Sequence, residues 1–365
     1  PWYLATSSTA ILASSAFDAK GNCVKLTGTG FYRLDSQQGN TVFDFSSFDG
    51  YWGEKARISK AQYLAVPNPE TRAMMAESGE GHIVIDLPAE SAQYLEQEAK
   101  RTGVGVVSHL LPRVRSLIVN SGLPVFASAE LRQAVSLCID RRGIAQAIHK
   151  EAGLAATQLL ADLTPWHDRS LPPLEYNPEK AKELFLQAGW KPNKEGVLEK
   201  DGQEFAFEIL TYSVRPDLPV VAQAIQQQLA NVGIRVSIAV DNASVIVSRH
   251  NDGTLQSALL GRNYSLVPDP IGNIAADFGE PRDPMGAMNW RSDAVQSLIN
   301  AYMEAFDPES ASKARSSIMA ILQAELPVLP ISWYANLSAV SGKLDNVNLD
   351  PYEIRAYTEG IRWKK

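Results

Sequence analysis

A short segment near residue 265 gathers polar side chains of several chemical types. It contains Arg262, Asn263, Tyr264 and Asp269, a serine hydroxyl between them, and two prolines that stiffen it. The residues before it, Ser257–Leu260, are strand-like. Loops held at the end of a strand are where ligand contacts concentrate. Composition alone favours an ordinary turn, but the four side chains are our candidate ligand-binding residues in this segment.

Catalytic chemistry finds little support elsewhere in the chain. We find no Gly-x-Ser-x-Gly elbow, no phosphate loop ending in Lys-Ser/Thr and no His-Glu-x-x-His motif. The five histidines are scattered, with no pair four residues apart. The two cysteines, Cys23 and Cys138, are too few for a disulfide framework or a zinc cluster, and leave one disulfide open. We therefore expect a protein that is not an enzyme, with no cofactor and no bound metal.

Composition indicates a folded chain of more than one domain. The 365 residues are 45% hydrophobic and 8% aromatic, enough for substantial cores. The formal charge is −7 and no basic run is present, so we expect no nucleic-acid partner. No stretch approaches the ~18 apolar residues of a membrane helix. The chain starts at Pro1 and no basic-then-apolar segment follows, so a leader was either absent or removed, and the start of the chain does not reveal the localisation.

The pattern of elements alternates helices with short β-rich runs. Asn177 can cap a helix that has Pro178 at its first position and ends at Gly189. A strand over 205–212, a helix over 221–232 and a strand over 234–240 then form a β-α-β unit, which favours parallel pairing. Two further helices are predicted, from Ser128 to about Glu151 and from Asp307 to about Leu326. Together these elements indicate an α/β or α+β chain.

Proline and glycine mark two candidate domain boundaries. Pro112 and the segment Ser121–Pro124 flank the β-like run Val114–Asn120, and Pro327 and Pro330 follow the last long helix. If the chain crosses between lobes at both places, its middle forms one lobe and its two ends form the other. We therefore expect lobe I over 1–113, lobe II over 114–326 and a return to lobe I over 327–365.

Several motifs resemble, in the correct order, the landmarks of extracytoplasmic solute-binding proteins of family 5, which serve peptide and nickel ABC importers. The match extends over nearly the whole chain. The matching segments are Gly28–Tyr32, Asp49–Lys55, Val66–Arg72, Leu131–Ala134, Ile139–Arg141, Asn177–Trp190, Ala222–Ile238, Pro268–Pro270 and Leu329–Ser332.

The resemblance implies a periplasmic-binding-protein type II fold: two α/β lobes, a hinge and a ligand held in an interlobe cleft. Family members carry on the order of a hundred residues before the point matching Pro1, so the resemblance implies either a chain that lacks the N-terminal part of lobe I or a naturally short relative. The implied function is a receptor that delivers a small peptide-like solute to the membrane subunits of an ABC permease. We expect a monomer located in the periplasm, or outside the membrane on a lipid anchor in a Gram-positive cell.

Residue roles carry over at three positions. Arg215 resembles an arginine that holds a peptide carboxylate in dipeptide-binding members, and Asp269 resembles the aspartate that receives the peptide amino terminus. Tyr264 lies where relatives place an aromatic residue that lines the cleft. One cation and one anion facing each other would suit a zwitterion.

Three further candidates come from position alone. Arg113 and Arg115 flank the first segment in which the chain is predicted to cross between the lobes. In a strand, residues two apart lie on the same face, so both side chains point either towards the ligand or towards solvent. Trp290 follows a Gly-Ala-Met-Asn loop and is a candidate for the ligand surface, although core packing is the better-supported role.

Two alternative functions stay open. Nickel-binding relatives are similar in several motifs, which suggests a receptor for a metal chelate or metallophore. However, residues 271–286 contain no histidine where those relatives place a metal-contacting one, and residues 1–17 contain no arginine where they hold a chelator. The other alternative is a solute-binding-like sensory module of a regulator.

Overall fold

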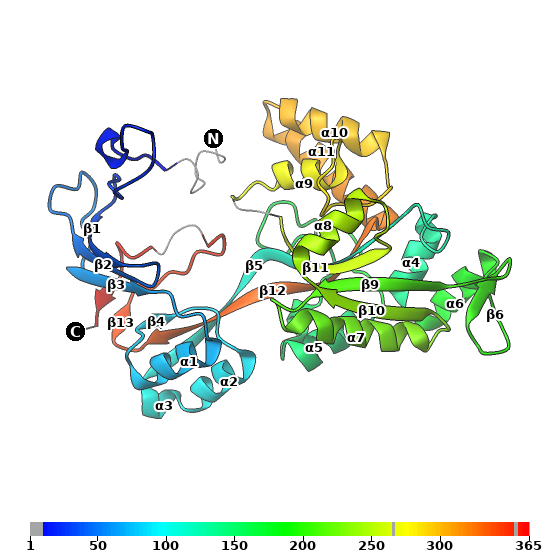
Figure 1. Ribbon diagram of the computed structural model, residues 1–365, viewed down its shortest axis with the longest axis horizontal. Coiled ribbons are helices and arrows are strands. Elements are labelled where there is room, and N and C mark those ends of the chain that lie inside the picture. Colours follow the sequence, from blue (N-terminus) through cyan, green and yellow to red (C-terminus); the bar gives the residue numbers. More distant parts are fainter. Residues whose placement is uncertain (1–9, 265–266, 354–356, 365) are drawn as a thin grey trace. The chain divides into compact units, whose positions relative to one another are not determined.

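The computed structural model describes residues 10–264, 267–353 and 357–364 and divides the chain into two compact units. Unit 1 comprises Pro1–Leu110 and Ala335–Lys365, and unit 2 comprises Leu111–Tyr334. The chain passes between them inside two long strands, β5 (Val104–Val119) and β12 (Val328–Ser341), both labelled in Figure 1. The unit boundaries thus lie at 110/111 and 334/335, where we expected 113/114 and 326/327.

Unit 1 contains a three-stranded antiparallel sheet and a small helical core. Strands β1 (Tyr32–Gln38), β2 (Val42–Ser47) and β3 (Lys60–Leu64) form the sheet in chain order. Its other elements are α1 (Pro69–Ser78), β4 (Ile83–Val84), α2 (Ala89–Gln97), α3 (Ala99–Thr102), the 3-10 helix η3 (Ser14–Ala16), β13 (Leu344–Asp345) and β14 (Arg362–Trp363). Strand β4 pairs with Ala339 and Val340 of β12, and the core there is built from side chains of α1, α2 and these strands.

Unit 2 is organised around a sheet whose strand order is β10-β9-β11-β5-β12. Strand β9 (Ala206–Tyr212) pairs in parallel with both β10 (Arg235–Asp241) and β11 (Ser257–Asn263), and β11 pairs antiparallel with β5. Burial of β9 and β11 is nearly continuous, as expected for central strands covered on both faces.

Helices surround this sheet (Figure 1). They are α4 (Ala129–Leu137), α5 (Arg141–Ile148), α6 (Pro178–Gln187), α7 (Asp217–Ala230), α8 (Ala243–Asn251), α9 (Ile271–Phe278), α10 (Asp293–Glu304) and α11 (Pro308–Glu325). Helix α7 packs on β9 and β10, α8 packs on β9, and α10 packs on α11. The remaining elements are η4 (Ala152–Leu154) and the strands β6 (Lys191–Pro192), β7 (Leu198–Lys200) and β8 (Gln203–Glu204), which form a small antiparallel sheet.

Several predicted elements are confirmed. The Asn177 side chain accepts a hydrogen bond from the Lys180 amide at 3.1 Å and caps α6, which has Pro178 at its start. The predicted β-α-β unit is formed by β9, α7 and β10, and its strands are parallel. The helix predicted from Asp307 to about Leu326 is α11, which begins at Pro308 after the cap Asp307 and ends at Glu325.

The single helix predicted from Ser128 to about Glu151 is wrong. Two helices, α4 and α5, occupy this stretch, and the break lies at residues 138–140. The Asp140 side chain accepts a hydrogen bond from the Gly143 amide at 2.8 Å and so caps a new helix. Apolar spacing continues through the break, so periodicity alone did not reveal it.

The strand predicted over Ser257–Leu260 continues to Asn263. Strand β11 stays paired with β5 up to its last residues, where Arg262 lies opposite Val114 and Asn263 lies opposite Arg113. Arg262 and Asn263 therefore belong to a strand and not to the predicted loop. Ser265 and Leu266 of that loop lie outside the described residues.

The two cysteines do not form a disulfide. Cys23 and Cys138 are both free, the first exposed and the second buried.

Across the described parts of the chain, no helix is long and apolar enough to span a bilayer.

Candidate functional site

Three of the predicted ligand residues meet around one aromatic ring in unit 2. Tyr334 of β12 is 6% exposed, and its ring is approached by three guanidinium groups. The Cζ atom of Arg115 lies 3.5 Å from the ring centroid, that of Arg215 lies 5.2 Å away and that of Arg113 lies 5.5 Å away. Guanidinium groups at such distances are attracted by the negative face of the ring. We call this group of four residues the arginine cluster.

Arg115 is fixed within the cluster by an ion pair. Its Nε donates to Asp217 Oδ2 at 2.5 Å, and its Nη1 donates to the Trp333 carbonyl at 3.0 Å. Asp217 lies in the first turn of α7, where a carboxylate also interacts favourably with the helix dipole. The positive charge of Arg115 is thus balanced inside the protein.

A buried hydroxyl links Arg115 to a histidine. Ser332 Oγ lies 3.5 Å from Arg115 Nη1 and 3.1 Å from His149 Nε2. Burial, together with the charge of Arg115, lowers the pKa of His149 to about 4. His149 is therefore neutral at pH 7 and adds no charge to the cluster.

Arg215 differs from Arg115 in its surroundings. It lies in the loop between β9 and α7, is partly exposed, and forms no ion pair with a carboxylate within 4 Å among the described residues. Burial opposes its charge, but Tyr334, Tyr212 and Asp217 outweigh that effect and raise its pKa. A solvent-accessible guanidinium beside an internally balanced one can accept an anionic group from a ligand.

Gly261 of β11 leaves the space that the cluster occupies. It lies opposite Arg115 in the β11–β5 register. A Cβ atom at this position would be 2.7 Å from the Tyr334 hydroxyl oxygen and 3.4 Å from Arg215 Nε. Only glycine therefore lets both side chains cross the sheet face here without a shift.

Asp269 lies in a different environment. Its Oδ1 accepts from the Ile271 amide at 3.1 Å and its Oδ2 accepts from the Tyr302 hydroxyl at 3.2 Å. Both residues are described, and no hydrogen bond or ion pair joins Asp269 to Arg215. The structure thus groups Arg215 with two other arginines and not with the predicted aspartate.

Arg262 is engaged in a structural ion pair. Its Nε donates to Asp277 Oδ2 at 2.9 Å, its Nη2 donates to Asp277 Oδ1, and Asp283 lies 3.6 Å away. Asp277 is fully buried, and burial raises its pKa in spite of the arginine. The pair holds the end of β11 to α9.

Tyr264 and Trp290 pack in the core of unit 2. Tyr264 is 1% exposed and its ring stacks on Phe278, with centroids 6.4 Å apart. Trp290 is 4% exposed and its Nε1 donates to Glu325 Oε2 at 2.7 Å. In the described structure neither side chain lies on a ligand-accessible surface, which corrects our expectation for Tyr264. Asn263 is half-buried, and its carbonyl accepts from the Asn273 side chain at 3.4 Å.

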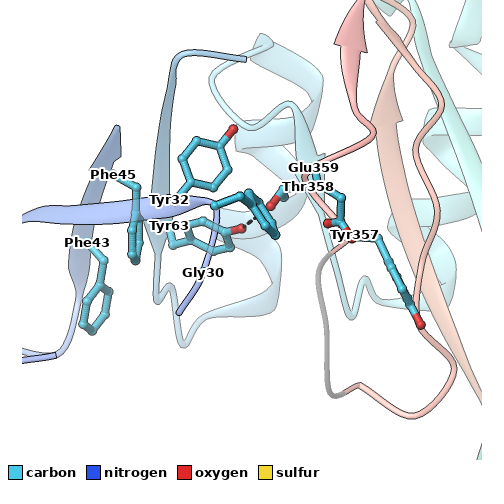
Figure 2. A pocket seen from close by; sticks show the side chains of 9 residues that line it. Gly30, Tyr32, Phe43, Phe45, Tyr63, Tyr357, Thr358 and Glu359 are labelled. Carbon is cyan, nitrogen blue, oxygen red and sulfur yellow. Dashed lines mark hydrogen bonds between the residues drawn. The ribbon is translucent and has the colours of Figure 1, made fainter. Parts of the chain in front are cut away.

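A second candidate site, which the sequence reasoning missed, lies in unit 1. It is a hollow of about 530 Å³ shown in Figure 2, and none of the eight predicted residues lines it. We call it the aromatic hollow; it is lined by Gly30, Phe31, Tyr32, Phe43, Phe45, Tyr63, Tyr357, Thr358 and Glu359. Phe43 and Phe45 are two residues apart in β2 and so share a face, a pattern that the sequence does contain.

Within residues 10–264, 267–353 and 357–364, no group of three or more His, Cys, Asp and Glu side chains is arranged to hold a metal ion.

Comparison with known proteins relates the chain to solute-binding proteins. A family model described as "Bacterial extracellular solute-binding proteins, family 5 Middle" matches residues 2–283. The nickel-binding periplasmic protein of Escherichia coli K12 is 24% identical over 343 residues, which are 92% of this chain and 64% of that protein. The oligopeptide-binding protein AppA of Bacillus subtilis is 26% identical over 257 residues, 68% of this chain and 46% of that protein. The chain thus spans about half to two thirds of these relatives' length.

Solved structures agree on the fold. NikA from Brucella suis, crystallised with Fe(III)-EDTA, superposes with a TM-score of 0.84 at 20% identity, covering 100% of this chain and 76% of that one. At this identity the likeness establishes the fold, which is that of type II periplasmic-binding proteins. Because the family model covers most of its length, the chain belongs to the bacterial extracellular solute-binding proteins of family 5.

Proposed function

We propose that this protein is the solute-binding receptor of an ABC importer and that it captures a small peptide or amino-acid-derived solute by its carboxylate. The observation that carries this proposal is the position of Arg215. Its guanidinium lies on the Tyr334 ring, is partly exposed, and forms no described ion pair.

A carboxylate is the group that suits this position best. The planar guanidinium donates two parallel hydrogen bonds to a carboxylate, and partial burial strengthens such charge-assisted bonds. Arg115 is held by Asp217 and therefore serves to position the Tyr334 ring and to keep the local potential positive. Arg113 also has an interaction within the protein, so Arg215 is the arginine of the cluster that we assign to the solute.

The relatives support a peptide-like solute. AppA is named an oligopeptide-binding protein, and a peptide ends in a carboxylate. In this proposal the receptor works outside the cytoplasmic membrane and passes its solute to permease subunits. A role for Asp269 at the amino terminus of the solute stays part of the proposal, with Tyr302 holding the carboxylate in place.

Thermal unfolding with matched ligands tests the proposal. A ligand that binds only the folded state adds stability of RT ln(1 + [L]/Kd), about 2.7 kcal/mol at a hundredfold excess over Kd. For a unit of this size that raises Tm by roughly 5–10 °C. We expect the shift with members of a dipeptide library and a smaller one with their C-terminal amides. A library in which no acid shifts Tm contradicts the proposal.

A pair of arginine variants locates the contact. Arg215→Gln should abolish the preference for the acid over the amide, because it removes the charge that binds the carboxylate. Arg33→Gln is the matched control, since the Arg33 side chain is 69% exposed and its partners among the described residues, Asp35 and Ser46, belong to its own sheet. If Arg215→Gln prefers the dipeptide acid over its amide as strongly as the unaltered protein does, the carboxylate binds elsewhere.

A metal chelate is the second candidate solute. The E. coli relative is named a nickel-binding protein, and the Brucella structure holds Fe(III)-EDTA, whose carboxylates have the same chemistry as a peptide terminus. This alternative predicts a Tm shift only when metal and chelator are added together. Elemental analysis of the purified protein separates it from the peptide proposal.

A further inference from the structure

The hydroxyl group of Tyr334 is buried without a hydrogen bond. The residue is 6% exposed, and guanidinium groups of the arginine cluster lie over its ring. Its hydroxyl oxygen is shielded from solvent and has no hydrogen-bond partner among the described residues. A buried polar group without a partner destabilises the folded state, and nearly all buried polar groups in proteins are paired. The Tyr334 hydroxyl is therefore a candidate for a contact that forms only when a solute is bound.

This hydroxyl lacks an acceptor for its proton. An arginine side chain carries N–H donors and no acceptor, so the guanidinium groups over the ring cannot take the proton. The amide of Gly261, which faces the hydroxyl from β11, is also a donor, and it donates to the Tyr212 hydroxyl oxygen at 3.2 Å. Burial raises the pKa of Tyr334 in spite of the nearby arginine charges, so its hydroxyl keeps the proton at pH 7. The group that would complete its bonding is an acceptor oxygen.

The Tyr334 hydroxyl lies beside the guanidinium that we assign to the solute. A Cβ atom on Gly261 would be 2.7 Å from the Tyr334 hydroxyl oxygen and 3.4 Å from Arg215 Nε, so both atoms border the same point above the sheet. Glycine places no side chain at this point, and both Gly261 and Arg215 are half-buried. A solute group that Arg215 binds is thus brought close to a hydroxyl that needs an acceptor.

We propose that Tyr334 is a specificity-determining residue, whose hydroxyl donates to one oxygen of the solute carboxylate while Arg215 binds the other. This inference rests on the proposed function, because it adds a second contact to the same carboxylate. The Arg215 side chain is long and partly exposed, and its movement from the ring towards the solute uncovers the hydroxyl. A C-terminal amide replaces one oxygen by an NH2 donor, which cannot accept from Tyr334. The two residues together therefore select solutes that end in a free carboxylate.

Calorimetric titration of Tyr334→Phe tests this hydrogen bond. The probes are the dipeptide acid that raises Tm most in the library experiment and the C-terminal amide of the same dipeptide. The variant keeps the ring beneath the guanidinium groups and removes only the hydroxyl. We expect the dipeptide acid to bind about tenfold more weakly, which corresponds to about 1.4 kcal/mol, and the amide to lose clearly less affinity. The Tm of the ligand-free protein should not fall, because the hydroxyl has no described partner to lose.

Tyr94→Phe is the control for the loss of a tyrosine hydroxyl. The Tyr94 hydroxyl belongs to unit 1 and donates to Glu77 Oε1 at 2.9 Å, so its removal should leave the affinity for the dipeptide acid unchanged. If Tyr94→Phe weakens binding as much as Tyr334→Phe does, the effect does not come from a contact beside Arg215 and the proposal is wrong.

The outcomes separate this inference from the proposed function. If the dipeptide acid binds the unaltered protein and Tyr334→Phe equally well, the hydroxyl meets only water, and the inference is wrong while carboxylate capture stands. Equal losses for the acid and the amide would show that the hydroxyl contacts another part of the solute. A lower Tm of ligand-free Tyr334→Phe would show a bond within the protein; either result also overturns the inference. If no dipeptide acid binds the unaltered protein, the proposed function and the inference both fail.

Discussion

The ion pair between Arg115 and Asp217 should contribute measurably to the stability of unit 2. The Arg115 side chain is 9% exposed and that of Asp217 is 26% exposed. Removing one partner of a buried pair usually costs about 3–5 kcal/mol, because the other charge stays buried. In Asp217→Asn the arginine keeps its bonds to Trp333 and Ser332, and the site is partly open to water. We therefore expect a loss of about 2–3 kcal/mol, below the usual range.

The loss is measurable as a fall in the thermal midpoint. With a change of about 2–4 °C per kcal/mol for domains of 150–250 residues, Asp217→Asn should lower Tm by roughly 4–12 °C. Circular dichroism during heating gives Tm, and a urea titration followed by the same signal gives the free energy of unfolding.

Asp293→Asn is a matched control for this experiment. Asp293 also lies in the first turn of a helix and pairs with an arginine, at 3.1 Å, but the two side chains are 87% and 76% exposed. Exposed pairs of this kind contribute about 0–1 kcal/mol, so Tm should barely change. Because both variants lose the same interaction with a helix dipole, their difference reports the burial of the pair. Equal losses in the two variants would refute the reasoning.

Three other changes have defined outcomes. Arg262→Met should lower the free energy of unfolding by about 3–5 kcal/mol at pH 7, because the charge of Asp277 stays buried without its partner. Burial raises the pKa of Asp277, so the folded state takes up its proton more readily as the pH falls. The loss of stability, measured by urea titration, should therefore shrink towards pH 5. Burial lowers the pKa of His149 to about 4, below the unfolded value of about 6.5, so stability should fall between pH 6.5 and 4, and less in His149→Gln. Cys23 should react quickly with a thiol reagent, and Cys138, whose pKa burial raises to about 12, only after unfolding; two unreactive cysteines after unfolding would indicate a disulfide.

The local parts of the fold were predictable from sequence. The helix beginning at Pro178 and the β-α-β unit over residues 205–240 are encoded by caps and periodicity within a few residues. The break before α5 was not, because it depends on a single capping side chain, Asp140, within a continuous apolar pattern.

The candidate site was predictable only in part. Arg113, Arg115 and Arg215 were named from position and resemblance, but Tyr334, which brings them together, was not. Its role depends on β12 lying beside β5, a pairing between strands more than two hundred residues apart that no local pattern reveals. Composition also could not distinguish the buried position of Tyr264 against Phe278 from a surface position, because the residue type is the same in both.

The discontinuity of unit 1 affects the order in which the protein is made. Strand β4 appears early in synthesis, but its partners Ala339 and Val340 leave the ribosome only after all of Leu111–Tyr334 has been translated. The inserted unit can therefore fold first, while the earlier segment waits with its sheet edge unpaired and open to chaperones or to other nascent chains.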